Sequence, residues 1–216
     1  MIYLDAAATT LEKPVGVHSA VIQALQAMSS PGRGNYPASH LAEETAFCCR
    51  SEAAALFGVD SPEKVIFTFN ATHGLNIAIR SLVKPGGRVI ISGYEHNAVT
   101  RPIHALEGVE IDTPLFCPAQ MPNEFARALE RGADAVVCTH VSNVFGYILP
   151  VEEIAALCCK HHVPLVVDAS QSAGVLPISL ERWKAEFIAM PGHKGLCGPQ
   201  GTGLLLCGGE AVPLLQ

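Results

Sequence analysis

Residues 164–174 read Pro-Leu-Val-Val-Asp-Ala-Ser-Gln-Ser-Ala-Gly, a continuous apolar run that ends in an aspartate and a small, polar turn. The run is short and has no polar alternation, which is typical of a strand buried on both faces. Similar apolar or β-rich runs recur at residues 65–69, 89–91, 109–111, 135–138, 187–190 and 204–206. Helix-sized segments separate most of them, so the sequence predicts an α/β fold with a largely parallel sheet covered by helices on both sides.

Helix signals occur both before and between these runs. In the sheet region, helical segments begin near Thr72, His96, Pro122 and Val151. Earlier in the chain, Pro14 precedes apolar residues at helical spacing, which are Val17, Val21, Leu25 and Met28. This pattern predicts a first helix with an apolar stripe, and a second, long helix is expected from Leu41 to Phe57, closed by Gly58.

Composition limits the classes of function. The chain has 216 residues, of which 49% are hydrophobic, and a mean hydropathy of +0.30, so it favours one large domain. A net charge of -6 and a pI near 5.8 provide no basic surface for nucleic acid or an anionic membrane. No apolar run is long enough to cross a bilayer, and the amino terminus has no signal-peptide pattern, so we expect a cytoplasmic protein.

The eight cysteines include two adjacent pairs, at 48–49 and 158–159, and none has CxxC spacing. This usage predicts reduced core cysteines in a cytoplasmic protein, with no metal site.

Ligands of open α/β sheets bind beyond the carboxyl ends of the strands, which makes the polar residues after each run candidates. The stretch 70–76 carries the hydroxyl of Thr72 and a glycine into a helix start that suits a phosphate, although an ordinary helix cap is the more common role of such a threonine. His96 offers a flat ring that can stack on a planar cofactor, or is a surface histidine. Asn143 is a neutral donor for a phenolate oxygen, or satisfies loop backbone.

Asp168 follows the apolar run 164–167 directly. A carboxylate that emerges from a buried strand is costly unless it is paired, and a protonated heteroaromatic nitrogen is a suitable partner. The other interpretation is that Asp168 caps the next helix.

The stretch 191–203 reads Pro-Gly-His-Lys-Gly-Leu-Cys-Gly-Pro-Gln-Gly-Thr-Gly and holds one lysine in a glycine-dense loop. Lys194 is the candidate reactive amine, although a lone lysine in such a loop is often a solvated surface charge. A lysine, a strand-end aspartate, a stackable histidine and a phosphate-type helix start together satisfy the needs of pyridoxal phosphate (PLP). A nucleotide-binding α/β protein is a weaker alternative, because no G-x-G-x-x-G opens a helix after an early strand.

The ordered segments 5–10, 71–76, 95–97, 142–146, 168–174 and 192–203 closely resemble the class V aminotransferase and cysteine desulfurase family. The resemblance spans essentially the whole chain and implies a fold type I PLP-dependent transferase with a seven-stranded, mostly parallel sheet. It implies that residues 1–216 form the large PLP-binding domain, including the N-terminal segment, and that a small C-terminal domain is absent from this chain. It also implies a homodimer with sites near the interface.

The resemblance assigns a role to each candidate residue. It implies that Lys194 is the Schiff-base lysine and that His96 stacks on the pyridine ring. Asp168 corresponds to the partner of the ring nitrogen. The resemblance also implies that Asn143 and Gln171 approach the ring hydroxyl oxygen. The phosphate-binding positions correspond to Thr72, His73 and His193. Lys194 and His96 are the expected catalytic residues.

Two positions depart from the family pattern, which often has asparagine at Ala6 and serine or threonine at Pro191. Family members also continue for well over a hundred further residues, which supply a carboxylate-binding arginine and, in desulfurases, a nucleophilic cysteine. None of the cysteines aligns with that nucleophile, and Cys197 is interpreted as local packing.

The expected function is a cysteine desulfurase that converts cysteine to alanine and passes sulfur to a protein acceptor. Alternatives are a class V aminotransferase or β-lyase acting on a small amino acid, and a non-catalytic truncated fragment.

Overall fold

The computed structural model describes residues 2–107, 110–112 and 118–209. Within them, one seven-stranded sheet has the order β1-β7-β6-β5-β4-β2-β3. The strands are β1 (Val65–Thr68), β2 (Arg88–Ile91), β3 (Glu110–Asp112), β4 (Ala135–Thr139), β5 (Leu165–Asp168), β6 (Phe187–Pro191) and β7 (Gly203–Cys207). Neighbouring strands from β3 to β6 are parallel, and β7 runs antiparallel to both β6 and β1. The prediction of an α/β fold with a mostly parallel seven-stranded sheet is confirmed.

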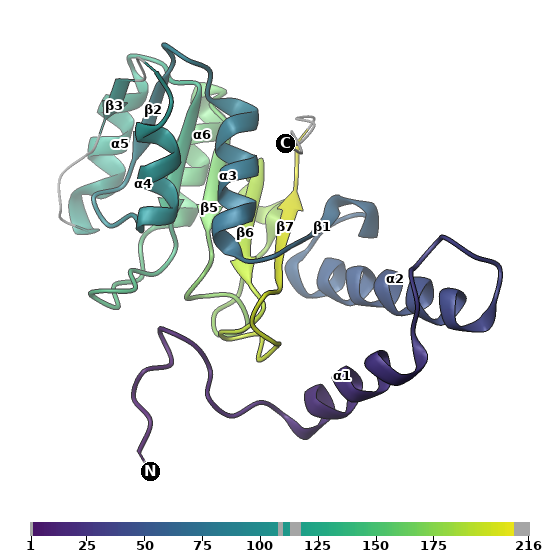
Figure 1. Cartoon of the computed structure of the whole chain (residues 1–216). Helices are drawn as coiled ribbons and strands as arrows, with labels where there is room; N and C mark the ends of the chain where they lie inside the picture. Colours follow the sequence, from purple (N-terminus) through teal and green to yellow (C-terminus); the bar gives the residue numbers. More distant parts are fainter. Residues whose placement is uncertain (1, 108–109, 113–117, 210–216) are drawn as a thin grey trace.

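Helices cover both faces of the sheet. α3 (Ala71–Leu82) and α4 (Asn97–His104) lie on the face nearer the viewer in Figure 1. The other face carries α5 (Met121–Leu129), α6 (Val151–His161) and the short α7 (Leu180–Trp183). Two 3-10 turns, η1 (Pro62–Lys64) and η2 (Pro118–Gln120), precede β1 and α5. The result is the three-layer arrangement expected of a parallel sheet with apolar faces.

The central strands are apolar on both faces because each face has its own core. In β5, Leu165 and Val167 belong to the cluster beneath α5 and α6, whereas Val166 packs with α3 and α4. Successive side chains of a strand point to opposite faces, so a run without polar alternation supplies both clusters. This explains why the strand signal of residues 164–168 carries no period of two.

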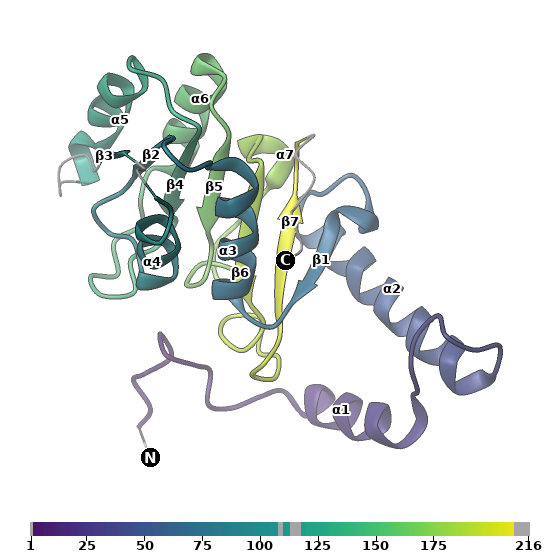
Figure 2. The same ribbon diagram turned by 45° about the horizontal axis from the view of Figure 1, so that its top comes forward.

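The first two helices form an arm beside the sheet (Figure 2). α1 (Val15–Ala27) has no buried residue, and Leu25 is 83% exposed. The helix itself was predicted, but its apolar stripe packs against no core within the described residues. α2 (Pro37–Phe57) buries its last turns against η1 and β1 and ends at Gly58, as predicted, with a left-handed φ of 61°. It starts earlier than expected because a proline at the first helical position costs no hydrogen bond.

Val109, the first residue of the predicted run 109–111, lies outside the described residues, and β3 covers 110–112. Among the described residues, Cys48, Cys49 and Cys159 are exposed, so the interpretation of all eight cysteines as core residues is wrong. Cys117 lies outside the described residues. Adjacent helical residues point about 100° apart, so a helix with one buried side exposes one member of a pair, as at 158–159. In the described part of the chain, no helix is long and apolar enough to cross a membrane.

Candidate active site

A cavity of about 420 Å³ lies beyond the carboxyl ends of β4, β5 and β6. Such a volume is in the range of small-molecule and cofactor sites. Its walls come from strand ends, the start of α3, the turn before α4 and the N-terminal segment. The lining residues are Asp5, Ala7, Ala8, Asn70, Ala71, Thr72, His96, Ala98, Thr139, Val141, Asn143, Asp168, Ser170, Gln171, Pro191, His193 and Lys194.

Asp168 is the last residue of β5 and is buried, with 2% of its surface exposed. Its Oδ1 accepts a hydrogen bond from the backbone N–H of Ser170 (2.9 Å). Burial raises the pKa of Asp168, whereas the bond from Ser170 and the charges of His96 and Lys194 lower it. A further positive charge in the cavity would therefore stabilise the ionised carboxylate.

The start of α3 forms one wall through Asn70, Ala71 and Thr72. Asn70 caps the helix, because its Oδ1 accepts from the N–H of His73 at 2.8 Å. The other N–H groups of a first helical turn have no partner within the helix, and they carry the positive end of the helix dipole. The side chain of His73 does not line the cavity but stacks on Phe69, with ring centroids 5.1 Å apart.

His96 is exposed and lies at the N-cap of α4. Its Nδ1 accepts a hydrogen bond from the N–H of Ala98 at 3.1 Å, which fixes one edge of the ring. The other edge is left for the cavity, which His96 lines.

Lys194 lies in the loop that follows β6, half-buried in the cavity wall. Burial lowers the pKa of Lys194 and the charge of Asp168 raises it. The pKa of His193 is lowered by burial and by the charges of Lys194 and Lys13. A lowered pKa leaves more of the lysine as the unprotonated amine, which is the form that attacks carbonyl groups.

Glycine is needed where this loop meets the turn after β5. Gly174 has a φ of 78°, and a Cβ at this position would lie 2.4 Å from the carbonyl oxygen of Gly195. Two backbone segments therefore touch directly, which places Lys194 beside the end of β5.

The N-terminal segment crosses the same loop, a contact between residues more than 180 apart in sequence (Figure 1). Thr9 Oγ1 and the N–H of Thr10 donate to the carbonyl oxygen of His193, and Thr10 Oγ1 donates to that of Lys194 at 2.7 Å. Lys13 Nζ also donates to the carbonyl oxygen of His193, at 3.0 Å. We call residues 5–13 the N-terminal strap.

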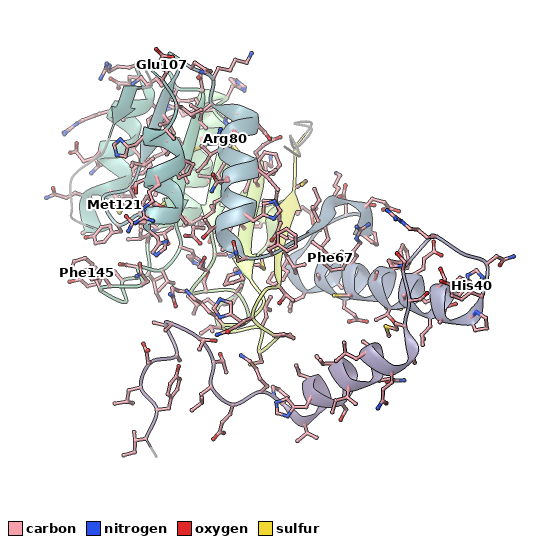
Figure 3. All side chains as sticks on the ribbon, in the orientation of Figure 1. His40, Phe67, Arg80, Glu107, Met121 and Phe145 are labelled. Carbon is pink, nitrogen blue, oxygen red and sulfur yellow. The ribbon has the colours of Figure 1, made fainter. Side chains whose placement is uncertain are left out.

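Asn143 and Gln171 also line the cavity. Gln171 Nε2 also donates to the carbonyl oxygen of Ala7 in the strap, at 3.0 Å. The loop that carries Asn143 continues into exposed aromatic residues, and Phe145 is seen at its tip in Figure 3.

The fold thus brings together seven of the eight residues predicted for the site, Thr72, His96, Asn143, Asp168, Gln171, His193 and Lys194, and it leaves out the side chain of His73. Sequence reasoning missed the strap contacts of Thr9, Thr10 and Lys13. The available signal was the segment 5–10, which was used for the resemblance but not for the site.

The described residues fit PLP. A half-buried amine faces the same cavity as a buried carboxyl group whose ionised form a cation would stabilise, and the start of α3 forms a wall suited to a phosphate.

The model of the family "Aminotransferase class-V" matches residues 2–215. This chain belongs to the class-V aminotransferase family. Members of this family are PLP-dependent enzymes.

Among curated class-V relatives, a "Probable cysteine desulfurase" of Chlamydia muridarum is 33% identical over 94% of this chain. The "Cysteine desulfurase IscS" of Pectobacterium carotovorum is also 33% identical over 94% of this chain. The alignments cover 53% and 52% of these relatives, so the chain spans about half the length of the curated proteins it matches.

Two solved structures share this fold. An apo cysteine desulfurase of Thermococcus onnurineus has a TM-score of 0.89 and 30% identity, covering 95% of this chain and 53% of that one. The cystine C-S lyase C-DES, solved with its product cysteine persulfide, has a TM-score of 0.84 and 25% identity, covering 95% and 56%.

Proposed function

We propose that the whole protein is a PLP-dependent cysteine desulfurase, which converts cysteine to alanine with sulfur transfer to a protein acceptor. The observation that carries the proposal is the pairing, in one cavity, of the half-buried amine of Lys194 with the buried carboxyl group of Asp168. The curated relatives described above are cysteine desulfurases, which supports the choice of reaction within the family.

The predicted site residues that line the cavity each have a role in this proposal. Lys194 binds the carbonyl group of PLP through its amine, and Asp168 pairs with the protonated ring nitrogen. Thr72 and the start of α3 hold the phosphate, together with His193. His96 stacks on the ring. PLP itself supplies an electron-withdrawing ring that stabilises negative charge on the substrate carbon.

The remaining ring contact is assigned to Asn143 and Gln171, which approach the ring hydroxyl oxygen. His73 needs a rotation away from Phe69 before its side chain can reach the phosphate. The proposal therefore gives His73 a role through the turn that it helps to form, because its N–H donates to Oδ1 of the capping residue Asn70 and orders the helix start.

Proton movement falls to two residues. Once substrate has displaced it, the amine of Lys194 takes and returns protons at the substrate carbon, because its lowered pKa leaves a larger share unprotonated near neutral pH. His96, which lines the same cavity, assists.

The sulfur step requires a cysteine thiolate. The thiolate attacks the sulfur of the substrate, the carbon–sulfur bond breaks, and the carbon fragment takes up a proton to become alanine. The attacking cysteine becomes a persulfide. Cys197 does not line the cavity, and its Sγ lies 3.6 Å from the carbonyl oxygen of Gly195, as expected for local packing.

Covalent attachment of PLP to Lys194 tests the proposal. Purified protein is mixed with PLP, dialysed, and scanned for an absorbance band near the visible; borohydride reduction and mass spectrometry then locate the attached group. We expect the band in the wild type and in the exposed-lysine control K84A, and none in K194A. A band that survives in K194A contradicts the assignment of Lys194. No band in the wild type at any PLP concentration supports a non-catalytic fragment instead.

A C–S lyase is the second candidate, because C-DES shares the fold at 25% identity. The products distinguish the two reactions in the whole protein. A desulfurase forms alanine and a protein persulfide, whereas a lyase acting on cysteine or cystine forms pyruvate and ammonia. An aminotransferase forms an oxo acid only when an amino-group acceptor is present.

We also infer that residues 1–216 are the large PLP-binding domain of a homodimeric cytoplasmic enzyme, with a small C-terminal domain outside this chain. The family resemblance supports this inference. Sedimentation of the whole protein tests the dimer, and fractionation of source cells tests the location.

A further inference from the structure

A buried carboxyl group lies beneath the candidate site and has no part in the roles above. Glu95 directly precedes His96 in the turn between β2 and α4. Although the residue is partly exposed, its carboxyl group is turned inward. Oε1 accepts hydrogen bonds from the N–H of Thr139 (2.7 Å) and from the hydroxyl of Ser92, and Oε2 is buried without a hydrogen-bond partner in the described part of the chain.

The position of Glu95 links three elements of the site. Thr139 is the last residue of β4 and lies opposite Asp168 in the register of β4 and β5. Ser92 is buried at the end of β2. Glu95 therefore connects the turn that carries His96 to the strand end beside Asp168.

The titratable groups that face the carboxyl group are acidic. Asp168 approaches from β5, and Cys138 approaches from β4. Burial raises the pKa of Glu95 to about 8, with a further increase from Asp168; the bonds from Ser92 and Thr139 oppose this only in part. His96, on the same turn, directs its Nδ1 to Ala98.

We propose that Glu95 is a positioning residue that acts as a neutral carboxylic acid. Its side chain holds the turn that carries His96 against the end of β4. Of the two neighbouring buried carboxyl groups, Asp168 is then the one that carries the negative charge. The roles of His96 and Asp168 rest on the proposed function; the neutral state of Glu95 does not. In its neutral form Glu95 keeps both accepted hydrogen bonds and places no second negative charge beside the partner of the ring nitrogen.

The neutral state is tested first without cofactor, so that the result does not depend on PLP. Thermal unfolding of wild type, E95Q and the exposed control E44Q is measured from pH 5 to pH 9.5. The folded-state pKa of Glu95 is raised above its ordinary value of 4.5, so its contribution to stability is present at low pH and is lost as the pH rises towards about 8. The melting temperature of the wild type should therefore fall relative to E95Q over this window and level off above it, while E44Q follows the wild type.

A second variant covers the case in which E95Q does not fold. S92A removes a hydrogen bond that lowers the pKa of Glu95, so the decline should extend to higher pH than in the wild type. Parallel pH profiles for wild type, E95Q and S92A overturn the neutral state.

The positioning role is tested by PLP titration at neutral pH. Glutamine reproduces the shape and the acceptor of the neutral acid, so E95Q should bind PLP within about twofold of the wild type. E95A leaves the N–H of Thr139 without its acceptor and should bind roughly tenfold more weakly. Equal loss in E95Q and E95A contradicts the proposal, because it means that the charge of Glu95 is required. If no variant binds PLP, the proposed function fails, and the unfolding profiles still decide the state of Glu95.

Discussion

The N-terminal strap allows a prediction with a defined magnitude. Thr10 Oγ1 donates to the carbonyl oxygen of Lys194 at 2.7 Å, and T10V removes this bond while keeping the shape of the side chain. The carbonyl oxygen keeps a second bond from the N–H of Cys197 (2.8 Å), so it is not left without a partner. The cost is therefore that of one neutral hydrogen bond, about 0.5–1.5 kcal/mol.

This cost should appear in cofactor binding. Most strap residues are exposed and the following α1 buries no residue, so the bonds to the 193–194 backbone are a large part of what holds the strap. If PLP binds only the arrangement with the strap in place, the free energy of the lost hydrogen bond raises the PLP dissociation constant of T10V about 2- to 12-fold. Absorbance titration of wild type and T10V measures this constant.

The chain provides a matched control. Thr45 Oγ1 also donates to a backbone carbonyl at 2.7 Å, that of Leu41, but on the exposed side of α2. T45V should leave PLP binding unchanged. Equal dissociation constants for T10V and T45V would refute the reasoning that the strap orders the lysine loop.

Two further predictions concern the same loop. Burial and the charges of Lys194 and Lys13 lower the pKa of His193, so K13M should raise this pKa. NMR titration of the His193 ring measures the change. An unchanged pKa would show that Lys13 acts only through its hydrogen bonds. G174A should destabilise the fold by about 1–3 kcal/mol in urea denaturation, because its Cβ meets the backbone of Gly195, whereas G201A, which has a similar φ of 82° and open space around it, should cost only about 1 kcal/mol. Equal losses of unfolding free energy in G174A and G201A would mean that the two segments move apart to accept the new Cβ at little cost.

Much of the candidate site was predictable because it follows strand ends. Asp168 is the last residue of β5, Asn143 follows β4, and Lys194 follows β6. In a parallel sheet these ends meet at one edge, so sequence position after a strand translates directly into proximity. The exception was His73, whose ring stacks on Phe69 while its Nδ1 accepts a hydrogen bond from the N–H of Phe69 at 3.4 Å.

Glu95 was not predictable as a buried acid. In sequence it stands in a polar turn between Tyr94 and His96, where a solvated glutamate is the ordinary outcome. Its inward direction follows from the N–H of Thr139 and the hydroxyl of Ser92, which the sheet places within reach. A hydrogen bond between residues 44 positions apart has no local signal.

The sequence by itself determined the layer architecture, because strands without polar alternation must be covered on both faces, and it determined which residues stand at the strand ends. The tertiary structure alone decided the placement of the N-terminal strap over His193 and Lys194, the inward turn of Glu95, and the exposure of α1. The physical reason is the sequence separation of the residues that interact. Periodicity and turn chemistry act over a few residues, whereas burial and the pairing of backbone carbonyls depend on segments that meet only in the folded chain.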